Sequence, residues 1–395
     1  MMHSESGNVY PIGLPTFWKG DYIPDEAKEP DRYYFVRIRT KFYLRDGFLP
    51  FLQIKDNPIY RGTECLTTSM FYDAKTGQYY EDYYEDFAAS MRSDPELAHK
   101  ARVKKDTYVT LTLTMTDFRL LQDHYVLKDC VILDGCYFYA VAGIFDSYIN
   151  KYKKIKMESD GAIRAIAKLF LNSLYGKMAM NTDSSFKYAY LKDDGTVSFA
   201  YVEQHDKHPG YIAIGSAITS YARNFTIRAA QANYHGVDKP GFIYADTDSI
   251  HCDLPPEKVV GIKVDPNDFC CWKLESCWDK AIFVRQKTYI EHITHENQIP
   301  IEQLTDKQGN PKKPYYSVKC AGMPDKCKDL FIKSMENYKI KDTDEFNEEE
   351  KEIIGKHYDM TDFKVGLTLY GKLRPVRIEG GVVLMDTPYK MREIL

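Results

Sequence analysis

Two aspartates separated by one residue stand in an apolar segment of the sequence. Asp246 and Asp248 belong to the string YADTDSI, residues 244–250, which Phe242 and Ile243 precede. A strand or a tight hairpin places both carboxylates on one face. Two carboxylates this close repel each other and are costly to desolvate unless a divalent cation neutralises them. An exposed turn would explain DTD alone, but the apolar flanks favour a metal-binding pair at the tip of a hairpin in the central sheet, facing an open cleft.

A second group of polar side chains follows the helical repeat around KLFLNSLYGK, residues 168–177. One stripe of the helical wheel carries cationic, amide and aromatic groups, namely Arg164, Lys168, Asn172 and Tyr175. The neighbouring stripe is apolar and consists of Ile163, Ile166, Phe170 and Leu174. The first stripe suits a nucleoside triphosphate, because cations bind phosphates and a ring stacks on a base. An amphipathic surface helix explains the cations equally well, but not NSLYG, which places poor helix formers near one helix end.

Strands and hairpins are predicted where apolar residues alternate. Residues 33–54 alternate around the Asp46–Gly47 turn, which predicts a hairpin, and residues 107–118 alternate as well. FKYAYLKDDGTVSFAYV, residues 186–202, predicts two strands around a DDG turn.

Helices are predicted at two places. Residues 158–177 have helical periodicity, with Ser159 or Asp160 as the N-terminal cap. Residues 216–236 form a second helix that Gly236 closes. Together with the strands, these helices predict an α+β fold in which helices pack on one face of an antiparallel sheet.

Length and composition narrow the class of protein. A chain of 395 residues is longer than one core normally supports, so we expect two or three subdomains. A net charge of −4 argues against a histone-like polyanion binder, although lysines and arginines gather in 149–156, 285–287 and 309–316. The nine cysteines lack CxxC spacing and are interpreted as reduced core residues. The sequence contains neither a membrane-spanning apolar run nor a signal peptide, which predicts a cytoplasmic protein without membrane partners.

The two strings resemble motifs of one family, in the family's order. KLFLNSLYGK resembles motif B of family B DNA polymerases, Kx3NSxYG, and YADTDS resembles their motif C, YxDTDS. RQKTYI, residues 285–290, is similar to the KxY motif that follows, with Lys287 and Tyr289 on one strand face. VKCAGMPDK, residues 318–326, and the later GGVVLMDTPYK are similar to the thumb of the protein-primed phage branch. The resemblance covers nearly the whole chain.

The resemblance implies roles for the matched positions. Asp248 would be a metal ligand, with Asp246 its partner near the primer terminus. The triphosphate would be held by Lys156, Arg164 and Lys168. The nascent base pair would be checked against Asn172, Tyr175 and Gly176. Lys287 and Tyr289 would steady the primer strand, and Lys319 and Lys326 would contact the duplex or the priming protein.

It also implies a division of the chain around a polymerase palm with an antiparallel sheet. Residues 1–50 would begin the palm, 51–145 would form the first insertion of the protein-primed branch, and 146–181 would be the fingers with motif B. Residues 182–215 would be the second insertion, a hairpin around downstream DNA, 216–300 the palm with motif C, and 301–395 a small thumb.

The implied activity is template-directed DNA synthesis. A primer 3′ hydroxyl, or a hydroxyl of a terminal priming protein, would attack the α-phosphate of a dNTP, and pyrophosphate would leave. Two Mg²⁺ ions, or Mn²⁺ in their place, would be the cofactors. Primer-template DNA, dNTPs and the priming protein would be the partners, in the host cytoplasm if the protein is viral.

One motif of the family is absent from the sequence. Motif A, an aspartate followed by SLYP, supplies another metal-bridging carboxylate, and MMHSESGNVYP resembles the stretch directly after it. The family's upstream exonuclease is absent as well. We therefore expect a split-gene product completed by an N-terminal fragment, or a truncated form, with little activity alone. The alternative is an inactive DNA-binding or assembly module, but such a module has no need of two acids that repel DNA. A metal-dependent nuclease would need a second acidic cluster.

Overall fold

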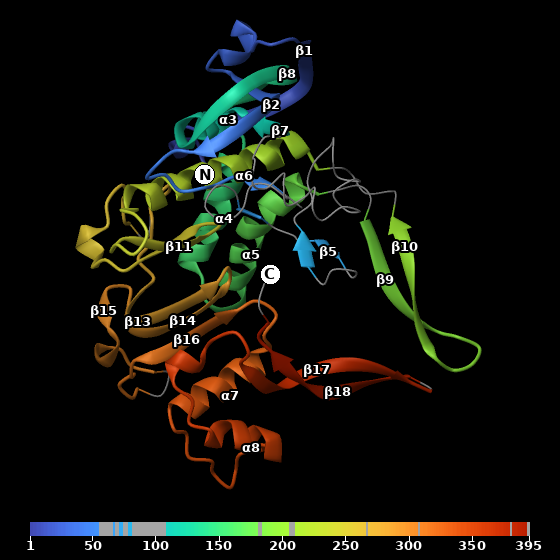
Figure 1. Ribbon diagram of the computed structural model, residues 1–395, viewed down its shortest axis with the longest axis vertical. Helices are drawn as coiled ribbons and strands as arrows, with labels where there is room; N and C mark the ends of the chain where they lie inside the picture. The colour runs from blue at the N-terminus through green and yellow to red at the C-terminus, as the bar shows by residue number, and fades with distance from the viewer. Residues whose placement is uncertain are drawn as a thin grey trace. The chain divides into compact units, whose positions relative to one another are not determined.

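The chain forms two compact units. The computed structural model describes residues 1–54, 66–67, 71–73, 78–80, 108–180, 184–204, 210–265, 268–306, 309–379 and 381–392. The first unit comprises residues 1–182 and 207–271, and the second comprises residues 183–206 and 272–395. Helices and antiparallel strands occur in both units, which confirms the predicted α+β class (Figure 1). The finer division into six parts stays a prediction.

A four-stranded antiparallel sheet is the centre of the first unit. Its order is β1 (Tyr10–Lys19), β8 (Tyr125–Val141), β2 (Arg32–Leu44) and β7 (Val109–Thr114). Buried side chains of the sheet and of α3 (Met115–His124) form one core, whose largest members include Tyr10, Tyr33, Phe42, Leu120, Leu121 and Tyr125. In Figure 1, α3 lies along the sheet and α6 (Ile212–Ala232) lies beneath it.

The hairpin predicted for residues 33–54 is wrong. β2 pairs with β8 on one side and β7 on the other, so its partners come from residues 109–141. Alternation specifies that a strand has one buried face, but it does not specify which strand is its neighbour. The alternation predicted for 107–118 is a strand only as far as Thr114. There the Thr114 hydroxyl accepts a hydrogen bond from the Asp117 amide at 3.1 Å and caps α3.

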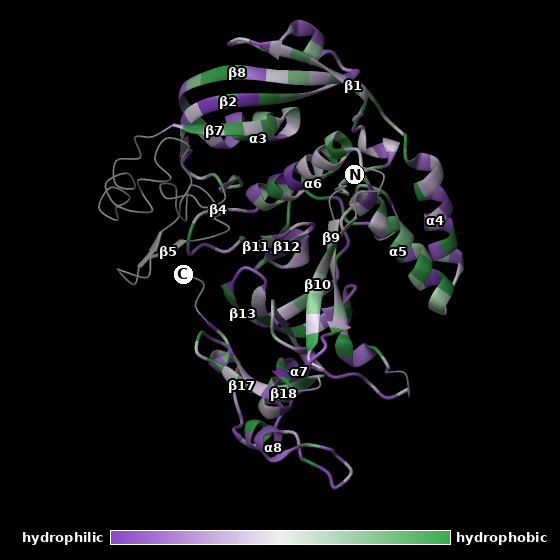
Figure 2. Ribbon diagram, turned by 90° about the vertical axis from the view of Figure 1, so that its right-hand side faces the viewer, coloured by the Kyte–Doolittle hydropathy of each residue, from purple (hydrophilic) through white to green (hydrophobic). Residues whose placement is uncertain are grey.

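Three further helices complete the first unit. α4 (Asp146–Glu158) and α5 (Gly161–Met178) pack against each other, and Figure 2 shows α4 as largely hydrophilic and α5 with broad hydrophobic bands. α5 begins after Asp160, as predicted. α6 begins earlier than predicted and ends at Ala232 instead of near Gly236. The fully buried Asn233 ends it, because its side-chain amide donates to the carbonyl of Ala229 at 2.9 Å.

The second unit contains the predicted hairpin, β9 (Ser184–Leu191) and β10 (Val197–Gln204), which is confirmed. A sheet is formed by β13 (Ser276–Arg285), β14 (Thr288–Glu296), β15 (Ile299–Pro300) and β16 (Tyr315–Cys320). Against it lies a core that includes residues of α7 (Asp325–Met335) and α8 (Glu348–Gly355).

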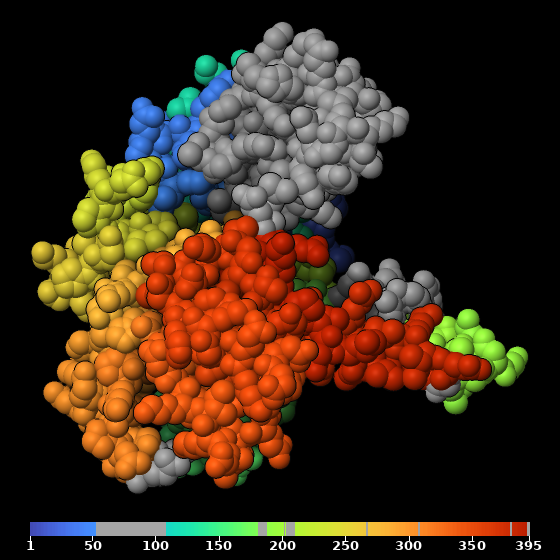
Figure 3. Space-filling model, turned by 60° about the horizontal axis from the view of Figure 1, so that its bottom comes forward, coloured from blue at the N-terminus to red at the C-terminus, as the bar shows by residue number. Residues whose placement is uncertain are grey.

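A second hairpin of this unit, β17 (Thr368–Ile378) and β18 (Gly381–Lys390), extends as a narrow arm from that body (Figure 3). The Arg377 guanidinium lies 5.8 Å from the centre of the Phe199 ring, so the two hairpins meet near their tips.

Short elements complete the described residues. They are η1 (Ser4–Ser6), η2 (Asp25–Lys28), β3 (Gln53–Ile54), β4 (Leu66–Thr67), β5 (Phe71–Asp73), β6 (Gln78–Tyr80), β11 (Phe242–Asp246), β12 (Ser249–Cys252), η3 (Pro256–Lys258), η4 (Ile301–Gln303) and η5 (Met360–Asp362). Of the predicted first insertion, residues 55–65, 68–70, 74–77 and 81–107 lie outside the described residues. No helix in the described ranges has both the length and the apolar character that a membrane span needs.

The described cysteines are free thiols, as the sequence predicted. Burial raises the pKa of the Cys252 thiol and of the Cys327 thiol to about 11. Both therefore stay protonated at neutral pH, and a protonated thiol is a poor nucleophile and metal ligand.

The buried His124 side chain makes the stability of the first unit depend on pH. It is 2% exposed, and its Nδ1 lies 2.8 Å from the Leu49 carbonyl oxygen. Burial lowers the pKa of His124, so the folded state binds its proton less tightly than the unfolded state does. The neutral ring therefore contributes stability that is fully present above a pH of about 6.5 and is lost as the pH falls through the folded pKa.

We expect the free energy of unfolding to fall between about pH 7.5 and about pH 5.5, and to fall less in His124→Asn. An asparagine amide can donate to the Leu49 carbonyl but does not titrate. Urea unfolding followed by circular dichroism at both pH values measures the difference. An equal loss of stability in both proteins would contradict this role of His124.

Candidate active site

The acid pair lies on a tight hairpin. β11 and β12 are antiparallel, Asp246 pairs with Ser249, and Thr247 and Asp248 form the turn between them. Asp246 is half-buried and Asp248 is exposed. The predicted hairpin tip is confirmed, but its predicted place in the central sheet is wrong. In the described part of the chain, β11 and β12 form a two-stranded sheet of their own, which packs against α6.

The turn is held in a strained conformation. Thr247 has a φ of 50°, in the left-handed region that β-branched residues rarely adopt. The Asp248 amide donates to the Asp246 carbonyl at 2.5 Å, and the Ser249 hydroxyl donates to the same carbonyl at 3.1 Å. The Thr247 hydroxyl donates to Asp246 Oδ1 at 3.0 Å. From α6, the Thr226 hydroxyl donates to the Thr247 carbonyl at 2.9 Å.

The base of the hairpin is tied to the end of α6. The Phe242 amide donates to the Asn233 carbonyl at 2.8 Å, and the Val260 amide donates to Asn233 Oδ1 at 2.9 Å. Gly241 has a φ of 150°, and a Cβ there would lie 2.2 Å from the Asn233 carbonyl oxygen. A glycine is therefore required where the chain passes from α6 into β11.

The polar stripe of α5 forms an exposed face, as predicted. Arg164, Lys168 and Asn172 are exposed, and Tyr175 is 40% exposed. Neither Arg164 nor Lys168 has an ion pair within the described ranges. The Arg164 guanidinium donates to the carbonyl of Lys156 at 3.2 Å, which brings these two predicted phosphate-binding residues together.

Space is open around the end of this stripe. A Cβ added at Gly176 would have no heavy atom within 4 Å outside its own helical backbone. The neighbouring apolar stripe is also largely exposed, at 60% for Ile163 and 52% for Ile166. Phe170 is half covered by Tyr152 of α4, with ring centres 4.8 Å apart.

α6 links the two motifs. It contacts α5, which carries the polar stripe, and it contacts both strands of the acid hairpin. Both strings that the sequence singled out for chemistry are thus attached to the same helix.

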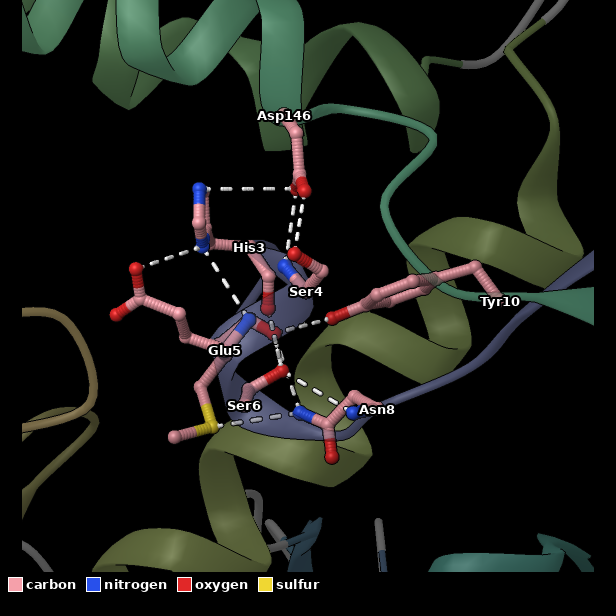
Figure 4. A network of polar contacts seen from close by, with 8 residues as sticks. His3, Ser4, Glu5, Ser6, Asn8, Tyr10 and Asp146 are labelled. Atoms are coloured by element: carbon pink, nitrogen blue, oxygen red, sulfur yellow. Dashed lines mark hydrogen bonds and ion pairs between the residues drawn. The ribbon is translucent and has the colours of Figure 1, made fainter.

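A network of polar contacts joins the first residues of the chain to the start of α4 (Figure 4). The Ser4 amide donates to Asp146 Oδ1 at 2.9 Å, and the Ser4 hydroxyl donates to Asp146 Oδ2. The hydrogen bond from the Ser4 hydroxyl lowers the pKa of Asp146. The Tyr10 hydroxyl donates to the Met1 carbonyl at 2.8 Å. No sequence motif indicated these contacts, because Ser4 and Asp146 are far apart in the chain.

Three of the predicted DNA-binding residues lie near one another in the second unit. Lys287 has a φ of 56° and lies in the turn before β14, so the prediction that it shares a strand face with Tyr289 is wrong. Its carbonyl accepts the Ala321 amide at 2.9 Å, which fixes the turn. Tyr289 pairs across the sheet with Lys319, whose side chain is exposed.

The fourth, Lys326, has a structural partner. Its ammonium forms an ion pair with Glu350, whose side chain is 2% exposed, and the hydrogen bond from this ion pair raises the pKa of Lys326. Glu350 also accepts the Asn347 amide at 3.1 Å in the capping box of α8. Lys326 therefore neutralises a buried carboxylate that supports α8.

The acid pair fits a Mg²⁺ ion that a substrate helps to bind. Among the described residues there is no group of three or more histidine, cysteine, aspartate or glutamate side chains that could hold a metal ion by itself. Mg²⁺ is commonly bound by one or two carboxylates together with water and substrate phosphates. The exposed Asp248 carboxylate has no ion pair within the described ranges, so it remains available as such a ligand.

Comparisons with known proteins relate the chain to DNA polymerases. A family model for DNA polymerase type B, organellar and viral, matches residues 92–260. The DNA polymerase of Bacillus phage Nf is 34% identical over 97% of this chain, and that of Streptococcus phage Cp-1 is 31% identical over 98%. The chain covers 54% of each of these two relatives, about half their length.

Solved structures give the same result for the fold. The phi29 DNA polymerase complexed with primer-template DNA and incoming nucleotide substrates matches 99% of this chain with a TM-score of 0.69 and 32% identity. This chain covers 55% of that polymerase.

The fold and the two motifs are those of part of a family B DNA polymerase. Within that family, the chain belongs to the protein-primed, phi29-type phage branch.

Removing the Lys326 ammonium should destabilise the second unit. Lys326→Ala leaves the buried Glu350 without its charged partner, and we expect a loss of about 1.5 to 3 kcal/mol in the free energy of unfolding. Lys319→Ala is the matched control, because Lys319 is exposed, and it should change stability by less than about 0.5 kcal/mol. Chemical denaturation measures both. Equal stability of Lys326→Ala and wild type would contradict the structural role.

Proposed function

We propose that this chain provides the motif B and motif C part of a template-directed DNA polymerase. In this reaction, a primer 3′ hydroxyl or a hydroxyl of a terminal priming protein attacks the α-phosphate of a dNTP and releases pyrophosphate. The observation that carries the proposal is that two elements contact α6. One is the hairpin with Asp246 and Asp248, and the other is the helix with Arg164 and Lys168. The phi29 polymerase that this chain resembles was solved with primer-template DNA and incoming nucleotides, which supports the same ligands here.

In this proposal the residues of the first unit bind and orient the nucleotide. Lys168 and Arg164, together with Lys156, hold the triphosphate by charge-assisted hydrogen bonds. Asn172, Tyr175 and Gly176 provide the open surface against which the nascent base pair is checked. Asp246 and Asp248 would hold Mg²⁺, or Mn²⁺, which would supply positive charge to neutralise the phosphoryl oxygens.

The proposed DNA contacts belong to the second unit. Tyr289 and Lys319, neighbours across two strands, steady the primer strand and the duplex, and Lys287 contributes from the adjacent turn. Lys326 would contact the duplex or the priming protein only through that part of its ammonium that Glu350 leaves accessible, since its side chain is 53% exposed. We place this activity in the cytoplasm of the phage host.

The alternative is an inactive DNA-binding or assembly module. The acid pair argues against it, because two adjacent carboxylates, one of them exposed, repel the DNA backbone and bring no benefit to a protein that only binds it. No D-x-x-SLYP string occurs in the 395 residues, so the proposed reaction takes its other metal-bridging carboxylate from residues outside this sequence.

Lys168→Ala should weaken nucleotide use more than DNA binding. The lost phosphate contact is worth about 1.5 to 3 kcal/mol, which corresponds to about a 10- to 100-fold higher KM for dNTP. Steady-state incorporation measures the KM, and fluorescence anisotropy of a labelled primer-template measures DNA binding. Lys177→Ala, in the same helix, is the matched control. An unchanged KM in Lys168→Ala would contradict the assigned role.

Primer extension tests the proposed function itself. We expect little extension by the chain alone with Mg²⁺, since a second metal-bridging carboxylate comes from motif A in this reaction. A mixture with a fragment of a related polymerase that ends after D-x-x-SLYP should extend the primer, and Asp248→Asn in this chain should abolish the extension. Stable association of the two parts without extension would favour the inactive module.

A further inference from the structure

We propose that Thr226 of α6 is a positioning residue for the turn that carries Asp246 and Asp248. Its hydroxyl donates to the Thr247 carbonyl at 2.9 Å. By holding this carbonyl, the hydroxyl fixes the plane of the peptide bond between Thr247 and Asp248. It thereby fixes the direction of the neighbouring carboxylates. The catalytic meaning of this contact rests on the proposed function, but the contact itself can be tested separately.

The turn needs support from outside. Thr247 occupies a left-handed conformation without being glycine, a geometry that persists only when surrounding contacts impose it. The hydrogen bonds among Asp246, Asp248 and Ser249 are local and can move together with the turn. The bond from Thr226 comes from a separate helix, so it ties the turn to a fixed frame.

The hydroxyl of Thr226 departs from the usual behaviour of a helical threonine. A threonine inside a helix commonly bonds a carbonyl of the preceding turn. Thr219, in the same helix, does this and donates to the Ser216 carbonyl at 2.9 Å. Thr226 is 6% exposed and donates instead to a residue 21 positions further along the chain. A buried donor used in this way points to a function in holding the turn.

α6 is itself held firmly by contacts within the two helical turns before Thr226. The Ser220 hydroxyl and the Arg223 guanidinium both donate to the carboxylate of Asp117, each at 2.7 Å. The Thr114 hydroxyl donates to Ser220 at 2.8 Å and so joins this group to β7. Because these contacts attach α6 to the sheet, the position of Thr226 is set by the core of the first unit.

The first measurement is amide hydrogen exchange of residues 247–249, which does not depend on catalysis. Thr226→Val keeps the side-chain shape but lacks the donor, and Thr226→Ser keeps the donor. Thr40→Val is the matched control, because the Thr40 hydroxyl is fully buried and donates to the Lys128 carbonyl at 3.1 Å in the sheet. We expect faster exchange of the turn in Thr226→Val, and wild-type exchange in Thr226→Ser and Thr40→Val.

The second measurement is incorporation by the mixture used for primer extension. Thr226→Val should lower kcat about 10- to 100-fold, the usual effect of removing a group that orients metal ligands, with the KM for dNTP unchanged. Thr226→Ser should restore kcat. Thr226→Ala provides a second variant without the donor if the valine side chain prevents folding.

The outcomes separate the two proposals. Wild-type exchange of the turn in Thr226→Val, or an equal change in Thr40→Val, overturns the role of Thr226. Faster exchange in Thr226→Val with rescue in Thr226→Ser supports that role even if the wild-type mixture incorporates no nucleotide. That last result would overturn only the proposed function.

Discussion

Two carboxylates one residue apart, those of Asp246 and Asp248, repel each other, and this is the constraint that the turn carrying them must satisfy. A permanent cation beside them would relieve it, but it would also occupy the place of a metal ion. Hydrogen bonds from a backbone amide and from the hydroxyls of threonine and serine hold the turn. Hydrogen bonds of this kind fix geometry without neutralising charge. The charge of Asp248, which has no ion pair within the described ranges, remains available for a ligand, and the strained turn that carries it needs α6 to hold it.

Lys326 and Lys168 differ in whether another residue of the protein already neutralises their charge. Lys326 neutralises a buried glutamate and supports a helix, so much of its charge serves the fold. Lys168 and Arg164 have no ion pair within the described ranges and point from a helix with an open surface. Like charges on one stripe repel each other and raise the free energy of the ligand-free protein slightly. A bound anion removes this repulsion. The sequence motifs did not distinguish Lys326 from Lys168, because a motif does not show which residue neutralises a charge.

The hairpin tip and the polar helical stripe were predictable from the sequence, and the contacts that support them were not. Apolar residues around DTD and the periodicity of KLFLNSLYGK led to the hairpin tip and the exposed stripe, because short local patterns determine both. Local patterns do not identify partners. β2 pairs with strands from residues 109–141, Lys287 adopts a turn conformation, and Thr226 bonds a carbonyl 21 residues away. Each of these depends on tertiary packing, which overrides local propensity.

Burial divides the first unit into a firm part and a weakly held part. Eight residues of α6 are buried, whereas in α5 the one buried residue is Ala167, and in α4 it is Ile149. Elements with few buried apolar contacts open at a lower free-energy cost than elements in the core. The helix that supports the acids is thus fixed, and the pair of helices that carries the cations is free to adjust. Under the proposed function, such a division suits a site in which the metal ligands keep their geometry while the helix with the cations admits and releases a nucleotide.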